Sequence, residues 1–159
     1  MYFTLYNSPH GEIALTANDK GLTALSFLQG ASPITVDETF KALPNKFTDV
    51  CNQLDQYFME KRKVFSLPLA PEGTPFQQSV WQALIKVQYG KTQSYQWLAK
   101  SINNEKAVRA VGAANGANPI SLIIPCHRVI GKNGKLTGYA GGLALKAKLL
   151  MHEKAQFKV

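Results

Sequence analysis

The sequence is poor in cysteine and has no long hydrophobic run. Its 159 residues include two cysteines, Cys51 and Cys126, which are too few for a disulfide framework and lack the C-x-x-C spacing of common zinc sites. No apolar stretch is long enough to span a membrane, and the N-terminal residues lack the basic and apolar regions of a signal peptide. We therefore expect a cytoplasmic protein with reduced thiols, no bound metal, no cofactor and no membrane contact.

Acidic residues are scarce in the second half of the chain. Residues 71–159 contain 12 Lys and Arg against 3 Asp and Glu, a net charge of +9, whereas residues 1–70 contain 6 against 7, a net charge of −1. All of the excess in the overall charge of +8 therefore lies in the second half. A basic field confined in this way favours a polyanionic partner, most simply nucleic acid. A solubilising basic surface is the alternative explanation.

The first half has the pattern of a small sheet covered by a helix. Strand-like runs separated by turn residues predict an antiparallel meander, with strands at residues 2–6, 13–16 and 22–27. From Lys46 to Arg62, apolar residues recur at helical spacing and predict an amphipathic helix. Cys51 falls on the apolar face of that helix, where we expect a packing role. His10 falls in a turn, where we expect it to be exposed.

Prolines and a glycine between Leu67 and Gly73 predict a linker, at the point where the charge also changes. The length of the chain fits one domain or two small ones. The linker favours two, a supporting domain at residues 1–70 and a second domain at residues 74–159. Together the two halves predict an α/β protein, more specifically α+β.

The second half has the caps and spacing of several short helices. Thr74-Pro75-Phe76-Gln77 predicts a capped helix start. Ser94 can cap a helix from Tyr95 to Ser101, and Asn103 or Asn104 can cap another from about residue 105 to 115. These two short helices form a helix-turn-helix candidate. Asn133-Gly134 is a hairpin signal, and a final helix is expected at about residues 143–154, packed through Leu143, Leu149 and Leu150.

The second helix of that pair consists mostly of small residues around Arg109. A helix that reads bases in the major groove normally presents several polar side chains, whereas this one can approach sugar and phosphate closely and project a single arginine. The composition therefore favours DNA binding without sequence preference. Tight packing between helices would explain the small residues equally well.

The stretch Ile124-Pro125-Cys126-His127-Arg128-Val129 places a thiol, an imidazole and a guanidinium in succession after an apolar run. Proline favours an extended residue before it, so we expect residues 122–124 to be a buried strand-like run. If Cys126 begins a helical turn, the free amides there favour a thiolate and lower its pKa, and the adjacent imidazole can take its proton. Cys126 is then a nucleophile, although buried structural cysteines are common.

Several segments together resemble the O6-alkylguanine-DNA alkyltransferase family, bacterial members in particular. The segments are Arg109–Gly112, Asn118-Pro119, Ile124–Val129, Gly138–Leu143 and His152-Glu153. The resemblance covers about residues 74–153, and the first half matches in general layout only. It implies a ribonuclease H-like supporting domain and a DNA-binding domain. It also implies DNA repair by direct reversal, in which an O6-alkylguanine is flipped out of double-stranded DNA and its alkyl group passes irreversibly to the protein.

The same resemblance implies roles for single residues. Cys126 is the nucleophile, His127 deprotonates it through a water, and Glu153 orients His127. Tyr95 protonates the leaving guanine, and Asn118 shapes the turn beneath Cys126. The remaining implied sites are DNA contacts at Ser94, Ala107, Arg109, Ala110, Gly112, Ala113 and Arg128, and a base pocket at Tyr139, Ala140, Gly141 and Gly142, with Arg128 either structural or facing phosphate.

The resemblance further implies a monomer that binds the minor groove without sequence preference. It leaves open the choice between methyl and larger alkyl groups, and activity on O4-alkylthymine. Two other classes compete. A cysteine enzyme of acyl transfer or proteolysis would need a distant histidine but no basic helix-turn-helix. A non-catalytic DNA-binding protein or regulator would have more polar side chains on its recognition helix.

Overall fold

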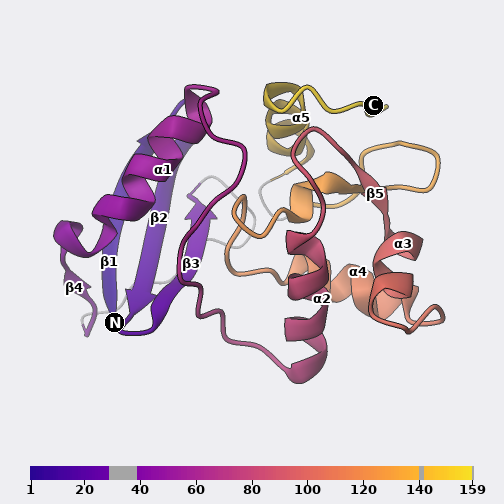
Figure 1. The fold of residues 1–159 in the computed structure, drawn as a ribbon, viewed down its shortest axis with the longest axis horizontal. Helices are drawn as coiled ribbons and strands as arrows, with labels where there is room; N and C mark the ends of the chain where they lie inside the picture. Colours follow the sequence, from indigo (N-terminus) through magenta and orange to yellow (C-terminus); the bar gives the residue numbers. More distant parts are fainter. Residues whose placement is uncertain (29–38, 140–141, 159) are drawn as a thin grey trace.

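The computed structural model describes residues 1–28, 39–139 and 142–158. A sheet with one helix lies on one side of the molecule, and a group of helices lies on the other (Figure 1). The predicted α+β class is confirmed. Ala140 and Gly141, two predicted pocket residues, lie outside the described residues.

The elements in chain order are β1 (Tyr2–Ser8), β2 (Gly11–Asn18), β3 (Gly21–Phe27), β4 (Lys41–Ala42), the 3-10 helix η1 (Pro44–Phe47), α1 (Thr48–Phe58), α2 (Pro75–Ile85), β5 (Gln93–Ser94), α3 (Tyr95–Ser101), α4 (Val108–Gly116), the 3-10 helix η2 (Cys126–Arg128), β6 (Val129–Ile130) and α5 (Leu143–His152).

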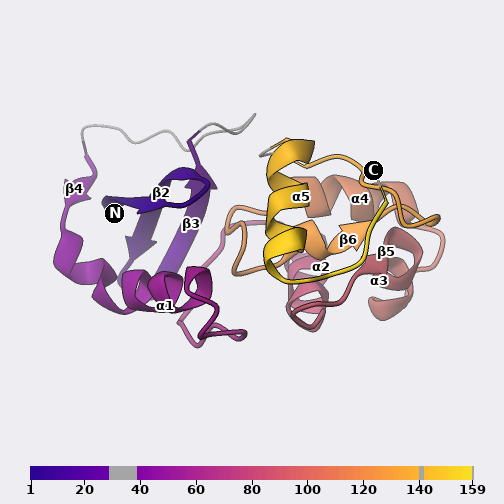
Figure 2. The ribbon, with the colours of Figure 1, turned by 90° about the horizontal axis from the view of Figure 1, so that it is seen from above.

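The N-terminal sheet has the strand order β3-β2-β1-β4. The pairs β1–β2 and β2–β3 are antiparallel, which confirms the predicted meander, and β4 is parallel to β1. α1 runs along one face of this sheet (Figure 2). Leu54 and Tyr57 of α1 are fully buried in the same cluster as Ile13, Leu15 and Leu25 of the strands. Burial of this apolar face is the driving force for docking the helix on the sheet.

Two details of the first half differ from the sequence prediction. The helical segment predicted at 46–62 is α1 alone, preceded by η1 and ended at Phe58. His10 is partly buried, because its ring packs edge-on against Phe58 with ring centroids 5.9 Å apart. The contact between His10 and Phe58 joins residues far apart in the chain, so the local sequence could not predict it.

The helices of the second half begin largely as their caps predict. Thr74 and Gln77 form the reciprocal capping box of α2, and the Ser94 hydroxyl accepts the amide of Trp97 at the start of α3. α4 begins at Val108, three residues later than expected, because Asn103 has a left-handed backbone (φ 57°) and no side chain caps the helix. The Trp81 indole on α2 donates to the Ala114 carbonyl on α4 and locks the two helices together.

The free edge of β3 joins the two halves of the molecule. Leu22 exchanges backbone hydrogen bonds with the segment 68–70, and Leu25 exchanges them with the segment 119–121, at 2.7 to 3.1 Å. The sheet edge is thus covered rather than left open. It also fixes the chain shortly before Cys126. Because the buried cluster contains residues from both halves, the division into two domains stays a prediction.

The segment before Cys126 is buried as expected but is not a strand. The Ile124 amide donates to the Ile120 carbonyl and the Ile123 amide to the Ser121 carbonyl, so residues 120–124 form tight turns. Leu122 has a φ of 74°, a left-handed conformation that is costly for a branched side chain. The prediction of an extended run was wrong because apolar composition fixes burial and does not fix backbone geometry.

The C-terminal part also departs from one expectation. α5 is shorter than predicted, and Leu143 is 48% exposed, whereas Leu149 and Leu150 are buried. Lys146 takes a buried position on the same helix. Asn133-Gly134 does form a tight turn, in which the Gly134 amide donates to the Gly131 carbonyl and Gly134 has a φ of 84°. Within residues 1–28, 39–139 and 142–158, no helix is long and apolar enough to cross a membrane.

Candidate active site around Cys126

Cys126 begins the short 3-10 helix η2, so the condition of a helical turn starting at this residue is met. The Arg128 amide closes the turn on the Pro125 carbonyl at 3.0 Å. Asn118 holds the same turn from below, because its side-chain amide donates to the Ile124 carbonyl at 2.7 Å and its oxygen accepts the Ile120 amide at 3.0 Å. The geometry agrees with the role expected for Asn118.

The Cys126 thiol is buried, and this changes its expected acidity. Burial raises the pKa of Cys126 above its usual value. The Asn118 side chain, the Lys146 ammonium and the local backbone amides oppose this rise but do not overcome it. The expectation of a lowered pKa for the free thiol was therefore wrong, because desolvation outweighs the field of one helical turn. A buried thiol of this kind needs a base when it reacts.

His127 and Glu153 form a buried pair next to the thiol. The His127 Nε2 atom lies 2.9 Å from Glu153 Oε2, and both side chains are fully buried. Burial lowers the pKa of His127. Burial opposes ionisation of Glu153, but His127 and Arg128 hold its pKa well below the usual range. A neutral imidazole facing a carboxylate carries its proton on Nε2. Its Nδ1 atom has no hydrogen-bond partner among the described residues and can accept a proton.

Arg128 supports this carboxylate and does not face the solvent. Its Nε donates to Glu153 Oε1 at 2.8 Å and its NH2 group to Oε2 at 3.1 Å, while its NH1 group donates to the Val87 carbonyl at 2.8 Å. The side chain is 7% exposed. A guanidinium that is buried and bonded in this way cannot reach a phosphate, so the predicted DNA contact at Arg128 is withdrawn in favour of the structural role.

Lys146 and Tyr57 are parts of the site that the sequence interpretation missed. The Lys146 Nζ atom is buried and donates to the Val129 and Thr137 carbonyls at 2.6 and 2.7 Å. Burial lowers the pKa of Lys146 to about 8. The Tyr57 hydroxyl on α1 donates to Glu153 Oε2 at 2.6 Å. The burial of Lys146 could have been predicted from the sequence, because its helical spacing places it on the same apolar face as Leu149 and Leu150.

The predicted contacts to the guanine base are Tyr95 and the described pocket residues Tyr139 and Gly142. The Tyr95 hydroxyl is 2.9 Å from the Thr137 hydroxyl, and its ring faces Gly112, where a Cβ atom would lie 3.8 Å away. Burial raises the pKa of Tyr139 well above the usual value, with the charge of Cys126 as the next cause. Gly142 is exposed with a φ of 93°. Tyr95, Tyr139 and Cys126 are thus parts of one neighbourhood, joined through residues 137–139.

The small-residue helix α4 presents most of its predicted DNA contacts to solvent. Arg109, Ala110 and Ala113 are exposed, while Ala107 and Gly112 are partly buried. Val111 and Ala114 face the core. Ser94 is partly buried and caps α3. One face of α4 therefore packs against the core, and the exposed face has a single long basic side chain, that of Arg109.

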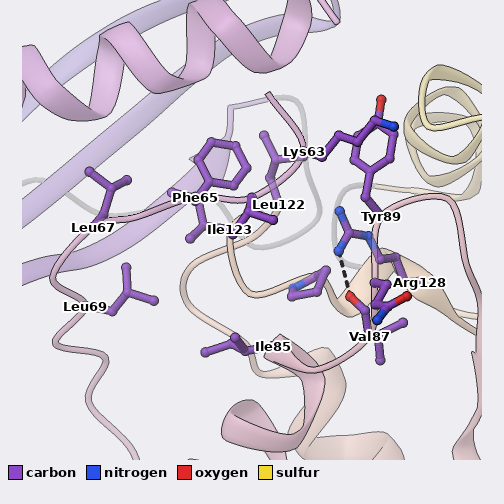
Figure 3. A pocket seen from close by; sticks show the side chains of 13 residues that line it. Lys63, Phe65, Leu67, Leu69, Ile85, Val87, Tyr89, Leu122, Ile123 and Arg128 are labelled. Carbon is purple, nitrogen blue, oxygen red and sulfur yellow. Dashed lines mark hydrogen bonds between the residues drawn. The ribbon is translucent and has the colours of Figure 1, made fainter. Parts of the chain in front are cut away.

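A cavity of about 400 Å³ lies beside Pro125 and Arg128, at the junction of the two halves (Figure 3). It is mostly apolar, and Figure 3 shows the bond from Arg128 to Val87 beside it. Cys126 is not among its lining residues, which are Lys63, Val64, Phe65, Leu67, Leu69, Ile85, Val87, Gln88, Tyr89, Leu122, Ile123, Pro125 and Arg128. The cavity is therefore separate from the thiol.

Comparison with known proteins gives a consistent result over nearly the whole chain. The family model described as "6-O-methylguanine DNA methyltransferase, ribonuclease-like domain" matches residues 1–71, and the one described as "6-O-methylguanine DNA methyltransferase, DNA binding domain" matches residues 75–155. The chain is 48% identical over 153 residues to the methylated-DNA--protein-cysteine methyltransferase of Methanosarcina acetivorans, covering 96% of this chain and 98% of that protein.

Two further similarities include a solved structure. The constitutive methylated-DNA--protein-cysteine methyltransferase of Bacillus subtilis is 44% identical over 162 residues, covering 99% of this chain and 98% of the relative. The crystal structure of Mycobacterium tuberculosis OGT in complex with DNA has a TM-score of 0.90 and 42% identity, over 97% of this chain and 93% of that one.

Proposed function

Because this chain belongs to the 6-O-methylguanine DNA methyltransferase family, we propose that Cys126 is the residue that takes the alkyl group from O6-alkylguanine in DNA. The family reaction is DNA repair by transfer of the alkyl group to a cysteine of the protein itself. The observation that carries the assignment is the buried His127–Glu153 pair, in which His127 directly follows Cys126. Cys51, the other cysteine, is partly buried on α1 and has no such pair.

The proposed step is a displacement at the alkyl carbon. The Cys126 sulfur forms a bond to that carbon, and the bond from carbon to the guanine O6 atom breaks. The thiol proton leaves toward His127 Nδ1 through a water, and the guanine gains a proton from Tyr95. His127 then releases its proton to the solvent and Tyr95 regains one from the solvent, so the net change is the exchange of the thiol proton for the alkyl group and no other reactant is consumed. The resulting thioether is stable. Each chain therefore reacts once.

The arrangement of charges supports this sequence of events. Since the Cys126 thiol is protonated at rest, the imidazole has to act as a base during transfer, and Glu153 stabilises the imidazolium that forms. This is the logic of nucleophile, base and orienter known from hydrolases, applied here to alkyl transfer. Lys146 adds a positive charge that favours the developing thiolate.

A guanine inside stacked DNA cannot be approached in line by a buried thiol, so the base has to leave the stack. In our proposal the exposed face of α4 contacts the DNA backbone along the minor groove, without sequence preference. Arg109 fills the emptied position, and Tyr139 and Gly142 line the pocket for the flipped base. A cytoplasmic location and a monomeric state also stay predictions.

The assignment is tested with duplex DNA that carries labelled O6-methylguanine. The wild-type chain should gain one methyl group, found on the Cys126 peptide by mass spectrometry, and Cys126→Ser should gain none while still binding DNA. Cys51→Ala serves as the matched control and should react like wild type. Label on Cys51 would refute the assignment. A lack of transfer with intact DNA binding would favour the non-catalytic class.

A further inference from the structure

Glu153 is held by more donors than the relay requires. Its carboxylate, on a residue 2% exposed, accepts from His127, from two groups of Arg128 and from the Tyr57 hydroxyl. The Tyr57 bond of 2.6 Å is the shortest of the four. Oε2 is the oxygen that faces His127, and Tyr57 donates to this same oxygen. The carboxylate that faces His127 is therefore coupled to a residue of the other half of the molecule, 96 positions before Glu153.

Tyr57 is itself fixed from several sides. It lies near the end of α1 and is fully buried. Its backbone carbonyl is bonded to His152 Nε2 at 2.9 Å, and its ring lies 4.8 Å from the His152 ring, measured between centroids. The rings of Phe65 and Phe58 pack at 5.5 and 5.1 Å. One residue of α1 thus binds two consecutive residues at the end of α5.

The hydroxyl, rather than the ring, distinguishes Tyr57 from ordinary core packing. A phenylalanine would fill the same space without placing a polar group in the interior, where a buried hydroxyl is costly unless it is bonded. Resting on the function proposed above, we infer that Tyr57 is a positioning residue, whose hydroxyl holds the Glu153 carboxylate against His127 and sets how strongly His127 binds a proton.

The sign of the effect follows from the shared oxygen. A hydrogen bond from Tyr57 withdraws electron density from Oε2 and makes the carboxylate a weaker partner for an imidazolium. Removing the hydroxyl leaves a more basic carboxylate facing His127, so the imidazole should hold its proton up to a higher pH. Because burial and the charge of Glu153 raise the pKa of Tyr57 above its usual value, the hydroxyl remains a donor throughout the accessible pH range.

The other titratable or charged groups around the pair come from several elements. Arg128 and Cys126 lie on η2, Lys146 on α5, Tyr89 on the segment after α2 and Tyr139 on the loop before α5. Tyr89 provides a matched control. Its hydroxyl contacts the His152 carbonyl at 3.5 Å, and its ring lies 6.1 Å from that of Tyr57, but no hydrogen bond joins it to Glu153.

The experiment measures the single-turnover rate of transfer from O6-benzylguanine, as the free base, between pH 5 and 9 with the full-length chain. In Tyr57→Phe the acid limb of the pH–rate profile should move up by roughly half to one pH unit. The rate should therefore fall several-fold below the wild-type midpoint of the acid limb and much less near pH 8. Tyr89→Phe should keep the wild-type midpoint.

A uniform loss of rate in Tyr57→Phe, with an unchanged midpoint, would overturn the inference and leave Tyr57 a packing residue. If Tyr57→Phe does not fold, 3-fluorotyrosine at position 57 decides instead. It is a stronger acid and hence a stronger donor, so the midpoint should move to lower pH, and an unchanged midpoint would again overturn the inference. If wild type adds no alkyl group to Cys126, the proposed function fails first, and the role of Tyr57 fails with it.

Discussion

At the scale of single residues, the site combines a thiol that resists ionisation with a base that is free to accept a proton. Desolvation raises the pKa of Cys126 and lowers the pKa of His127. At neutral pH the resting pair is therefore a thiol and a neutral imidazole. This state avoids a buried, unpaired charge. In the proposed reaction, the thiolate arises only when a proton acceptor and a substrate are both in position.

The pH dependence of labelling tests this resting state. We expect iodoacetamide to react with Cys126 along a curve whose apparent pKa lies above the reference value of about 8.5. Peptide mass spectrometry separates this label from label on Cys51. Alkyl transfer should behave differently and stay active near pH 7, falling only as the pH drops through the lowered pKa of His127, below about 6.5. Labelling of Cys126 that is already complete and pH-independent at pH 7 would contradict a protonated resting thiol.

The family resemblance predicts Cys126 as the nucleophile, His127 as its base and Glu153 as the orienting carboxylate, but neither it nor the residue order points to Tyr57. The motif from Pro125 to Val129 states which side chains are adjacent in sequence. The contact between Tyr57 and Glu153 depends instead on how α1 and α5 meet, which is a long-range property of packing. Arg128 shows the same limit, since a basic residue after a catalytic motif fits either a phosphate contact or a buried support.

At the scale of elements, local signals predicted helix starts where a side chain supplies the missing bonds. Thr74 and Ser94 both cap the helices expected of them. The start of α4 was misplaced because Asn103 uses its tolerance of left-handed geometry to turn the chain and caps nothing. The extended run predicted at residues 122–124 was wrong for a related reason. The turns at residues 120–124 are stabilised by Asn118 and by the edge of β3, and these contacts are not visible in the local sequence.

The division of α4 into a packed face and an exposed face gives Arg109 a testable role. Unstacking a guanine costs a few kcal/mol, and a planar guanidinium can stack in the emptied position better than an ammonium can. If Arg109 supplies about 1–2 kcal/mol of this cost, Arg109→Ala should slow transfer from duplex DNA roughly 5- to 30-fold. Transfer from free O6-benzylguanine, which needs no flipping, should be almost unchanged.

Two variants sharpen this comparison. Arg109→Lys should lie between wild type and Arg109→Ala on duplex DNA. Lys100→Ala removes another exposed basic side chain, at the end of α3, and at saturating DNA it should leave the transfer rates from both substrates almost unchanged. Equal slowing of both substrates by Arg109→Ala would mean that Arg109 supports the fold or the thiol.

At the scale of the whole molecule, the supporting half contributes to the site through two separate contacts. The edge of β3 holds residues 119–121, next to Asn118, and Tyr57 holds Glu153. These contacts lie on the two sides of Cys126, one before it in sequence and one after it. The sheet-containing half, with a net charge of −1, thus contacts residues of the candidate active site, while the half with a net charge of +9 supplies the positive charge that favours DNA binding.

The uneven charge leads to a prediction about salt. Neutralised phosphates release counterions, so the logarithm of the binding constant should fall linearly with the logarithm of salt concentration, by about 0.9 per phosphate contact. Lys106 is exposed in the turn before α4, close to Arg109 in sequence, whereas Lys61 is exposed in the half with a net charge of −1. Lys106→Gln should weaken binding to every duplex sequence and reduce the salt slope by about one, while Lys61→Gln should change neither.

Fluorescence anisotropy with scrambled duplexes at several salt concentrations measures both quantities. An equal loss of slope in the two variants would show that the whole surface attracts DNA, and a strong preference for one undamaged sequence would contradict binding led by the backbone.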